Sequence, residues 1–146
     1  SEIAFVVAGL LRSFYYSSAV EEVTYCFTFP HSMTTAYSSF ISQKPTFESI
    51  EALTTVEVLS ISRIEILRLE ETSTNWLKLF KHLAEQEYLK MEKRIFLLQK
   101  ETAEKRYADL MKSHPEYLQA VPLHYLSSYL GITQRHLSRI RRSMLK

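Results

Sequence analysis

A group of arginines lies near the C-terminus of the 146-residue chain. On a predicted helix over residues 134–146, one arc consists of polar and basic residues: Gln134, Arg135, Ser138, Arg139, Arg141 and Arg142. A guanidinium can hold O6 and N7 of guanine with two hydrogen bonds, a glutamine amide can hold adenine in the same manner, and further cations bind phosphate. The chemistry available to this arc is recognition of double-stranded DNA.

The residues around this arc predict a helix-turn-helix. Pro122 suits the first position of the first helix, Gly131 suits a left-handed turn, and Thr133 can cap the second helix. The facing sides of the two helices would be formed by small and apolar residues: Leu126, Ser127, Leu130, Leu137 and Ile140. The alternative is a terminal helical hairpin whose basic face is merely solvated.

Catalytic chemistry finds little support in the sequence. The chain has only two glycines, Gly9 and Gly131, which are too few for a phosphate-binding loop. Its five histidines are scattered and Asp109 is its only aspartate, so no Ser-His-Asp arrangement can be argued. Cys26 is the only cysteine, which excludes a disulfide framework, a cysteine zinc site and an iron–sulfur cluster. We therefore expect that the chain is not an enzyme and has no catalytic or metal-binding residues.

The first third of the chain has the periodicity of β-structure. Short apolar or alternating runs predict strands at residues 3–7, 10–16, 23–29, 48–53 and 56–61. Gly9 and Pro30 interrupt these runs, and no helical pattern separates the strands, so antiparallel pairing in a roll or sandwich is expected. The period of residues 33–44 is ambiguous.

The pattern changes to helical at Ser62, which forms a possible capping box with Glu65. A long helix is predicted from Trp76 to about Gln99, with shorter helical stretches at 102–112 and 116–120. Apolar residues recur along the long helix at heptad spacing, imperfect only at Lys81 and Thr102: Leu77, Ala84, Tyr88, Met91, Ile95 and Leu98. We assign this seam to a second copy of the chain; the alternative is internal core.

Charge is distributed unevenly along the chain. Residues 1–62 contain two basic residues and six glutamates, whereas residues 115–146 contain five basic residues and one glutamate. The basic end suits a polyanionic partner. No apolar run approaches the ~18 residues of a membrane span and no secretory signal is present, so we expect no membrane partner and a cytoplasmic location.

In order and kind, these elements resemble the Crp/Fnr family of bacterial transcriptional regulators, and residues 4–12 look like the strand, glycine and strand of its cyclic-nucleotide-binding roll. The resemblance implies an α+β fold. An antiparallel, jelly-roll-like β-roll would occupy residues 1–62 as the effector lobe. A short helix and a long dimerisation helix would occupy 63–101, and a helix-turn-helix DNA-binding domain 102–146.

The same resemblance implies a homodimer formed through the seam, with the second helix of each motif in the major groove. Gln134, Arg135 and Arg139 would then contact bases and Arg142 a phosphate, with Ser138 on the same arc. His136 either reaches DNA or packs at the helix start. RNA polymerase is a further candidate partner.

The chain departs from the cyclic-AMP-binding members of the family. Those members have a Gly-Glu pair and an Arg-Ser pair, but residues 33–49 contain no glycine, and Thr46-Phe47 stands at the expected position of the Arg-Ser pair. Without that cation a bound phosphate would lack compensation, so we expect neither cyclic AMP nor another cofactor. A pocket for an uncharged ligand, or a filled core, would be formed by these residues: Tyr37, Phe40, Lys44 and Phe47.

The two ends of the chain also differ from the family pattern. The sequence starts inside an apolar run, as expected of a chain that lacks the N-terminal part of the roll. It stops at Lys146 without the β-wing of many members, which fits either a wingless form or a sequence that ends early. The competing class is a ligand-binding or dimerisation module without DNA binding.

Overall fold

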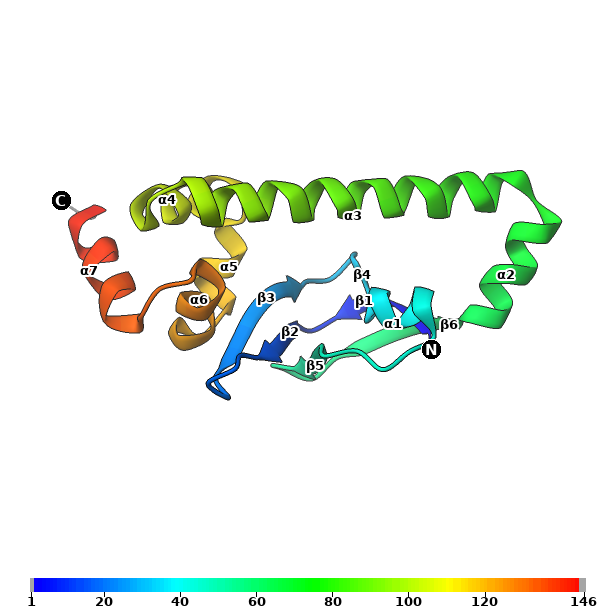
Figure 1. Cartoon of the computed structure of the whole chain (residues 1–146), viewed down its shortest axis with the longest axis horizontal. Helices are drawn as coiled ribbons and strands as arrows, with labels where there is room; N and C mark the ends of the chain where they lie inside the picture. The colour runs from blue at the N-terminus through cyan, green and yellow to red at the C-terminus, as the bar shows by residue number, and fades with distance from the viewer. Residues whose placement is uncertain (1, 145–146) are drawn as a thin grey trace. The chain divides into compact units, whose positions relative to one another are not determined.

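A computed structural model describes residues 2–144 of the chain (Figure 1). These residues form two compact units, the first ending at Ala84 and the second beginning at Glu85. Helix α3 (Thr74–Lys100) begins in the first unit and ends in the second. None of the helices within residues 2–144 has the length and apolar character needed to cross a membrane.

The first unit is built from two antiparallel three-stranded sheets. One sheet has the order β4-β1-β6 and the other β3-β2-β5. The bounds of the strands are β1 Glu2–Ala8, β2 Leu11–Tyr16, β3 Glu22–Thr28, β4 Met33–Thr34, β5 Ser49–Ala52 and β6 Glu57–Ser62. All five predicted strands are present, and the prediction of an α+β fold with antiparallel sheets is confirmed.

Gly9 allows the chain to pass from β1 in one sheet to β2 in the other. Its φ of +91° lies in the region that favours glycine, and a Cβ at this position would collide with the carbonyl oxygen of Thr55. Directly after it, the amide of Leu10 donates to Thr54 Oγ1 at 2.9 Å. The predicted strand break is therefore also a point of close contact with the β5–β6 connection.

A buried arginine lies in the sheet formed by β3, β2 and β5. Arg12 is 1% exposed, and its Nη1 donates to Glu22 at 2.7 Å and to Glu51 at 2.6 Å. Its Nε donates to Thr24 Oγ1 at 2.8 Å, and its guanidinium lies 4.3 Å from the centre of the Phe14 ring. One side chain of β2 is thus tied to both neighbouring strands.

The stretch that was ambiguous in sequence contains β4 and a short helix, α1 (Tyr37–Ser42). The predicted capping box is confirmed at the start of α2 (Arg63–Thr72), where Ser62 Oγ accepts from the Glu65 amide and the Glu65 carboxylate accepts from the Ser62 amide. The long helix α3 follows, as predicted. Local side-chain caps therefore set the boundary between sheet and helix.

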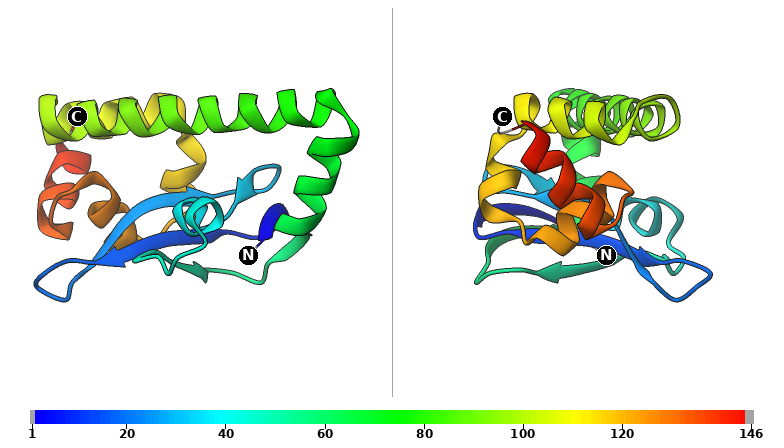
Figure 2. Two further views of the ribbon diagram at one scale, coloured as in Figure 1. Left: turned by 45° about the vertical axis from the view of Figure 1, so that its right-hand side comes forward. Right: turned by 90° about the vertical axis from the view of Figure 1, so that its left-hand side faces the viewer.

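Four further short helices belong to the second unit: α4 (Ala103–Ser113), α5 (Pro115–Ala120), α6 (Leu123–Leu130) and α7 (Gln134–Met144). They surround a small apolar core formed by Ala103, Tyr107, Leu110, Tyr117, Val121, Leu126, Leu130, Leu137 and Ile140. Figure 2 shows α6 (orange) and α7 (red) as separate helices. Pro122 precedes α6 as its N-cap, one residue earlier than predicted.

Candidate nucleic-acid interface

The turn between α6 and α7 has the geometry of a helix-turn-helix. Gly131 adopts a left-handed conformation, with φ 67° and ψ 37°. The amide of Gly131 donates to the Ser128 carbonyl, and that of Ile132 to the Ser127 carbonyl, both at 3.0 Å. Thr133 Oγ1 then accepts from the His136 amide at 3.2 Å and caps α7. The roles predicted for Gly131 and Thr133 are therefore confirmed.

The facing sides of α6 and α7 are apolar and buried, as predicted. Leu137 is 0% exposed, and the other inward residues are also buried: Leu126, Ser127, Leu130 and Ile140. Ser127 satisfies its buried hydroxyl by donating to the His124 carbonyl at 2.9 Å. The packed inner side orients α7 and leaves its opposite side to solvent.

The outer side of α7 exposes the predicted arc to solvent. Its exposed members are Gln134, Arg135, Arg139, Arg141 and Arg142, and Ser138 between them is half-buried. The sequence of α7 contains no Asp or Glu, so no carboxylate within the helix neutralises these guanidinium groups. The surface is positive and rich in hydrogen-bond donors, which suits an anionic partner.

His136 lies at the side of this arc and faces α4. Its Nε2 is 3.7 Å from a carboxylate oxygen of Glu104, and the imidazole is half-buried. The pKa of Glu104 is lowered, mainly because its carboxylate accepts a hydrogen bond from its own backbone amide at the start of α4, with smaller contributions from Thr102 and His136. This placement favours packing at the helix start over base contact for His136.

The predicted seam along α3 faces solvent in the single chain. None of residues 74–100 is buried, and the exposed apolar members of the seam are Leu77, Tyr88, Met91, Ile95 and Leu98; Ala84 is half-buried. The alternative, in which these residues form part of an internal core, therefore does not hold for a single chain. Leu98 is also close to the turn between α6 and α7: a Cβ placed on Gly131 would lie 3.4 Å from Leu98 Cδ2.

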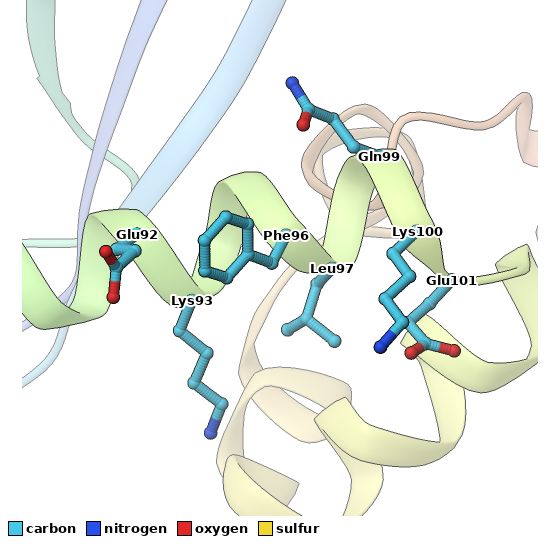
Figure 3. Close-up of a pocket in the computed structure, with 7 residues that line it drawn as sticks. All are labelled: Glu92, Lys93, Phe96, Leu97, Gln99, Lys100 and Glu101. Carbon is cyan, nitrogen blue, oxygen red and sulfur yellow. The ribbon is translucent and has the colours of Figure 1, made fainter.

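A hollow of about 620 Å³ lies beside the last turns of α3. Its lining, shown as sticks in Figure 3, consists of Glu92, Lys93, Phe96, Leu97, Gln99, Lys100 and Glu101. The ring of Phe96, next to the seam residue Ile95 in sequence, is also exposed. Apolar side chains of α3 therefore face solvent outside the heptad positions as well.

The four candidate effector residues do not meet in one pocket. The rings of Tyr37 and Phe40 stack on α1 with centroids 6.2 Å apart. Phe40 lines a pocket of about 280 Å³ together with Glu2, Ala4, Thr34, Thr35, Ala36, Ser39 and Ile50. Lys44 is exposed, and Phe47 is 95% exposed, so in the single chain Phe47 belongs neither to this pocket nor to a filled core. None of the lining residues is basic.

Sequence reasoning did not identify Arg12 as an interior residue. A signal was present, because Arg12 is the one charge in the run from Leu10 to Phe14, and an isolated cation among apolar strand residues indicates a buried ion pair. Among residues 2–144, no three His, Cys, Asp or Glu side chains gather as metal ligands would.

The chain matches no protein-family model and no curated protein sequence. Solved structures share its fold. FixK2 from Bradyrhizobium japonicum is 18% identical, with a TM-score of 0.84 over 98% of this chain and 74% of that one. CLP from Xanthomonas campestris, a c-di-GMP responsive global regulator, is 14% identical, with a TM-score of 0.73 over 99% and 77% of the two chains.

A Crp/Fnr-family regulator from Eubacterium rectale is 15% identical, with a TM-score of 0.72 over 98% of this chain and 68% of that one. Two of these similar proteins, CLP and the one from Eubacterium rectale, are regulators. The chain therefore has the fold of Crp/Fnr regulators.

Proposed function

We propose that the chain is a sequence-specific DNA-binding transcription regulator of the Crp/Fnr type that acts as a homodimer. The observation that supports this most is the two-sided character of α7, whose inner side is buried against α6 while its outer side exposes arginines to solvent. An apolar inner side fixes the helix, and a free basic outer side is what major-groove recognition requires.

The side chains on α7 divide by the contacts that they can make. Arg135 and Arg139 are long enough to hold guanine edges and Gln134 can hold adenine, whereas Arg142, near the end of the helix, suits a phosphate. Base contacts provide specificity, and phosphate contacts provide affinity that falls with salt. Arg135 and Arg139 are therefore the residues on which specificity depends most.

The exposed seam of α3 supports dimerisation. Paired along this face, two chains would bury the apolar side chains that a single chain leaves in water, and would present two α7 helices to half-sites about one helical turn apart, near ~34 Å. A palindromic DNA site is the natural partner of such a dimer. A regulator of this kind would act in the cytoplasm of a bacterium. RNA polymerase would be its further partner there.

Regulation would act through the β-lobe. A signal received there would change the population of dimers able to bind DNA. The Phe40 pocket has no basic lining residue, so an uncharged ligand fits it better than cyclic AMP. Control by protein abundance, without any ligand, is the second possibility.

The proposal is tested by selecting bound sequences from a random DNA pool with the purified full chain. We expect a palindromic consensus, because two identical motifs related by a two-fold axis read the same half-site twice. Absence of any enriched sequence would contradict the proposal and favour a ligand-binding or dimerisation module.

The seam has its own test in the substitution Ile95→Glu, which places a carboxylate on an apolar face. We expect the dimer to weaken by at least about 2 kcal/mol, because two charges would lose water in the interface. Sedimentation velocity should then show monomers. Gln86→Glu, which adds the same charge to the same helix away from the seam, should leave the dimer intact; a dimeric Ile95→Glu protein would refute the seam.

A further inference from the structure

Helix α6 is capped by a side chain from another helix. Arg94, in the part of α3 that belongs to the second unit, donates from Nη2 to the carbonyl of Tyr129 at 2.9 Å. Tyr129 lies in the last turn of α6, where carbonyl groups have no partner within the helix and the helix dipole is negative. The guanidinium therefore provides both a donor and the favourable charge.

The same guanidinium also packs on the side chain of Tyr129. Its Cζ lies 3.9 Å from the centre of the Tyr129 ring, within cation–π range. The Tyr129 ring packs edge-on against the ring of Tyr117 in α5, with ring centres 5.8 Å apart. The ring centre of Tyr117 lies in turn 4.8 Å from that of His114, at the α4–α5 junction. Arg94 thus binds both the backbone carbonyl and the side-chain ring of Tyr129. These two interactions together oppose rotation of α6 relative to α3.

Two further contacts fix the same junction. Leu98, one turn after Arg94, approaches the turn between α6 and α7: its Cδ2 would lie 3.4 Å from a Cβ placed on Gly131, so even a Cβ there would be in contact with it. A second arginine, Arg106 of α4, reaches back to the C-terminal end of α3. Its Nη1 donates to the Glu101 carbonyl at 2.8 Å and to the Leu98 carbonyl at 3.4 Å. The end of α3 and the end of α6 are therefore each capped by an arginine from a neighbouring helix.

One turn of α3 serves both the seam and the helix-turn-helix. Ile95 is exposed on the seam, whereas its neighbour Arg94 is half-buried against α6. We propose that Arg94 is a positioning residue that fixes the helix-turn-helix on the dimerisation helix and thereby sets the spacing of the two DNA half-sites. This inference rests on the proposed function.

The contact of α3 with α6 through Arg94 is called the joint here. Its rigidity decides how strongly the affinity for DNA depends on the spacing of the half-sites. One inserted base pair separates the half-sites by about 3.4 Å more and rotates one about 34° relative to the other. A rigid joint cannot follow this change, so an altered spacing costs affinity. A joint without Arg94 allows α6 and α7 to turn together, which reduces both the affinity for the best spacing and the penalty for a wrong one.

The experiment measures affinity for the selected palindrome, for the same palindrome with one and two base pairs inserted at its centre, and for a single half-site. Arg94→Ala should reduce the ratio of affinities between the best and the altered spacings about tenfold, the effect of one charge-assisted hydrogen bond. Affinity for the single half-site should stay within about twofold, because α7 is unchanged. Arg94→Lys should be intermediate, since an ammonium can donate but cannot stack as a plane.

Lys93→Ala is the matched control, because it removes an exposed charge from the adjacent position and should leave the spacing ratio unchanged. If Arg94→Ala weakens all three classes of DNA equally, or leaves the ratio unchanged, Arg94 has only a structural role and the inference is wrong. If Arg94→Ala does not fold, Arg94→Lys and Tyr129→Leu, which removes the ring but keeps the carbonyl, must show the reduced ratio. Failure of the unaltered protein to bind any palindrome would instead overturn the proposed function, and the inference with it.

Discussion

Arg12 of the sheet unit and the arginines of α7 in the helical unit have opposite roles. In the sheet unit, Arg12 is buried and its guanidinium binds carboxylates from both neighbouring strands. In the helical unit, the interior of the helix-turn-helix is apolar, and Arg135 and Arg139 are exposed. The first arrangement uses a cation to join strands of one chain, and the second leaves cations available to another molecule.

The difference concerns specificity of folding as much as stability. Arg12 pairs directly with Glu51 across β2 and β5, so a shift of register by one residue would place the guanidinium on the wrong face. The helix-turn-helix needs no such pair, because Leu126, Leu137 and Ile140 define its inner side. The comparison predicts that removing the ion partners of Arg12 destabilises the sheet unit, whereas removing exposed arginines of α7 alters binding.

The largest effect is expected at the buried ion pair. Replacing both Glu22 and Glu51 by Ala removes the two carboxylates bound to Arg12 and should lower the free energy of unfolding by about 3–5 kcal/mol, since a buried charge loses its compensation. Chemical denaturation measures this change. Glu57→Ala, an exposed glutamate of β6, is the control and should change stability little. Equal stabilities would show that Arg12 does not depend on its partners.

A smaller effect, on binding rather than stability, is expected on α7. Arg135→Ala or Arg139→Ala should each cost about 1–3 kcal/mol of DNA affinity and relax base preference, whereas Arg142→Ala should mainly reduce the salt dependence. Titrations at several salt concentrations measure both quantities, and thermal unfolding should be unchanged because these side chains are exposed. The assignment of base readers fails if all three variants weaken selected and random DNA equally.

The smallest effect is expected at the capping box. Ser62→Ala should cost about 1 kcal/mol of stability. The hydrogen bond from the Ser62 side chain, followed by that from its amide, lowers the pKa of Glu65 below its ordinary value of 4.5. Because the folded-state pKa is lowered, this stabilisation is present above pH 4.5 and is lost as the pH falls through the lowered value. Denaturation at several pH values should show that Glu65→Gln lacks this acid-dependent loss; an identical pH profile would contradict the argument.

Much of the fold could be predicted from local patterns. Alternation identified β3, the capping box located the start of α2, and Gly131 with Thr133 located the turn before α7. These features depend on neighbours within a few residues, which is why they can be recognised in sequence. The buried inner side of the helix-turn-helix was predicted for the same reason.

The candidate effector pocket shows where such reasoning ends. Composition placed Phe47 with Phe40, but the connection after α1 leaves Phe47 exposed and gives Phe40 different neighbours, Thr34 and Ile50 among them. A loop residue has no period that fixes its direction. Its surroundings depend on where distant strands bring their side chains.

By itself, the sequence determined the order of five strands and of the helices from α2 to α7, the apolar seam of α3 and the solvent-facing arginines of α7, because hydrophobic period and helix caps are short-range properties. It left undecided the stretch that forms β4 and α1. Only the tertiary structure decided which other arginines turn inward. Glu51 lies 39 residues from Arg12, and Tyr129 lies 35 residues from Arg94. A guanidinium can leave water only where folding brings such acceptors to it, and no local pattern specifies that meeting.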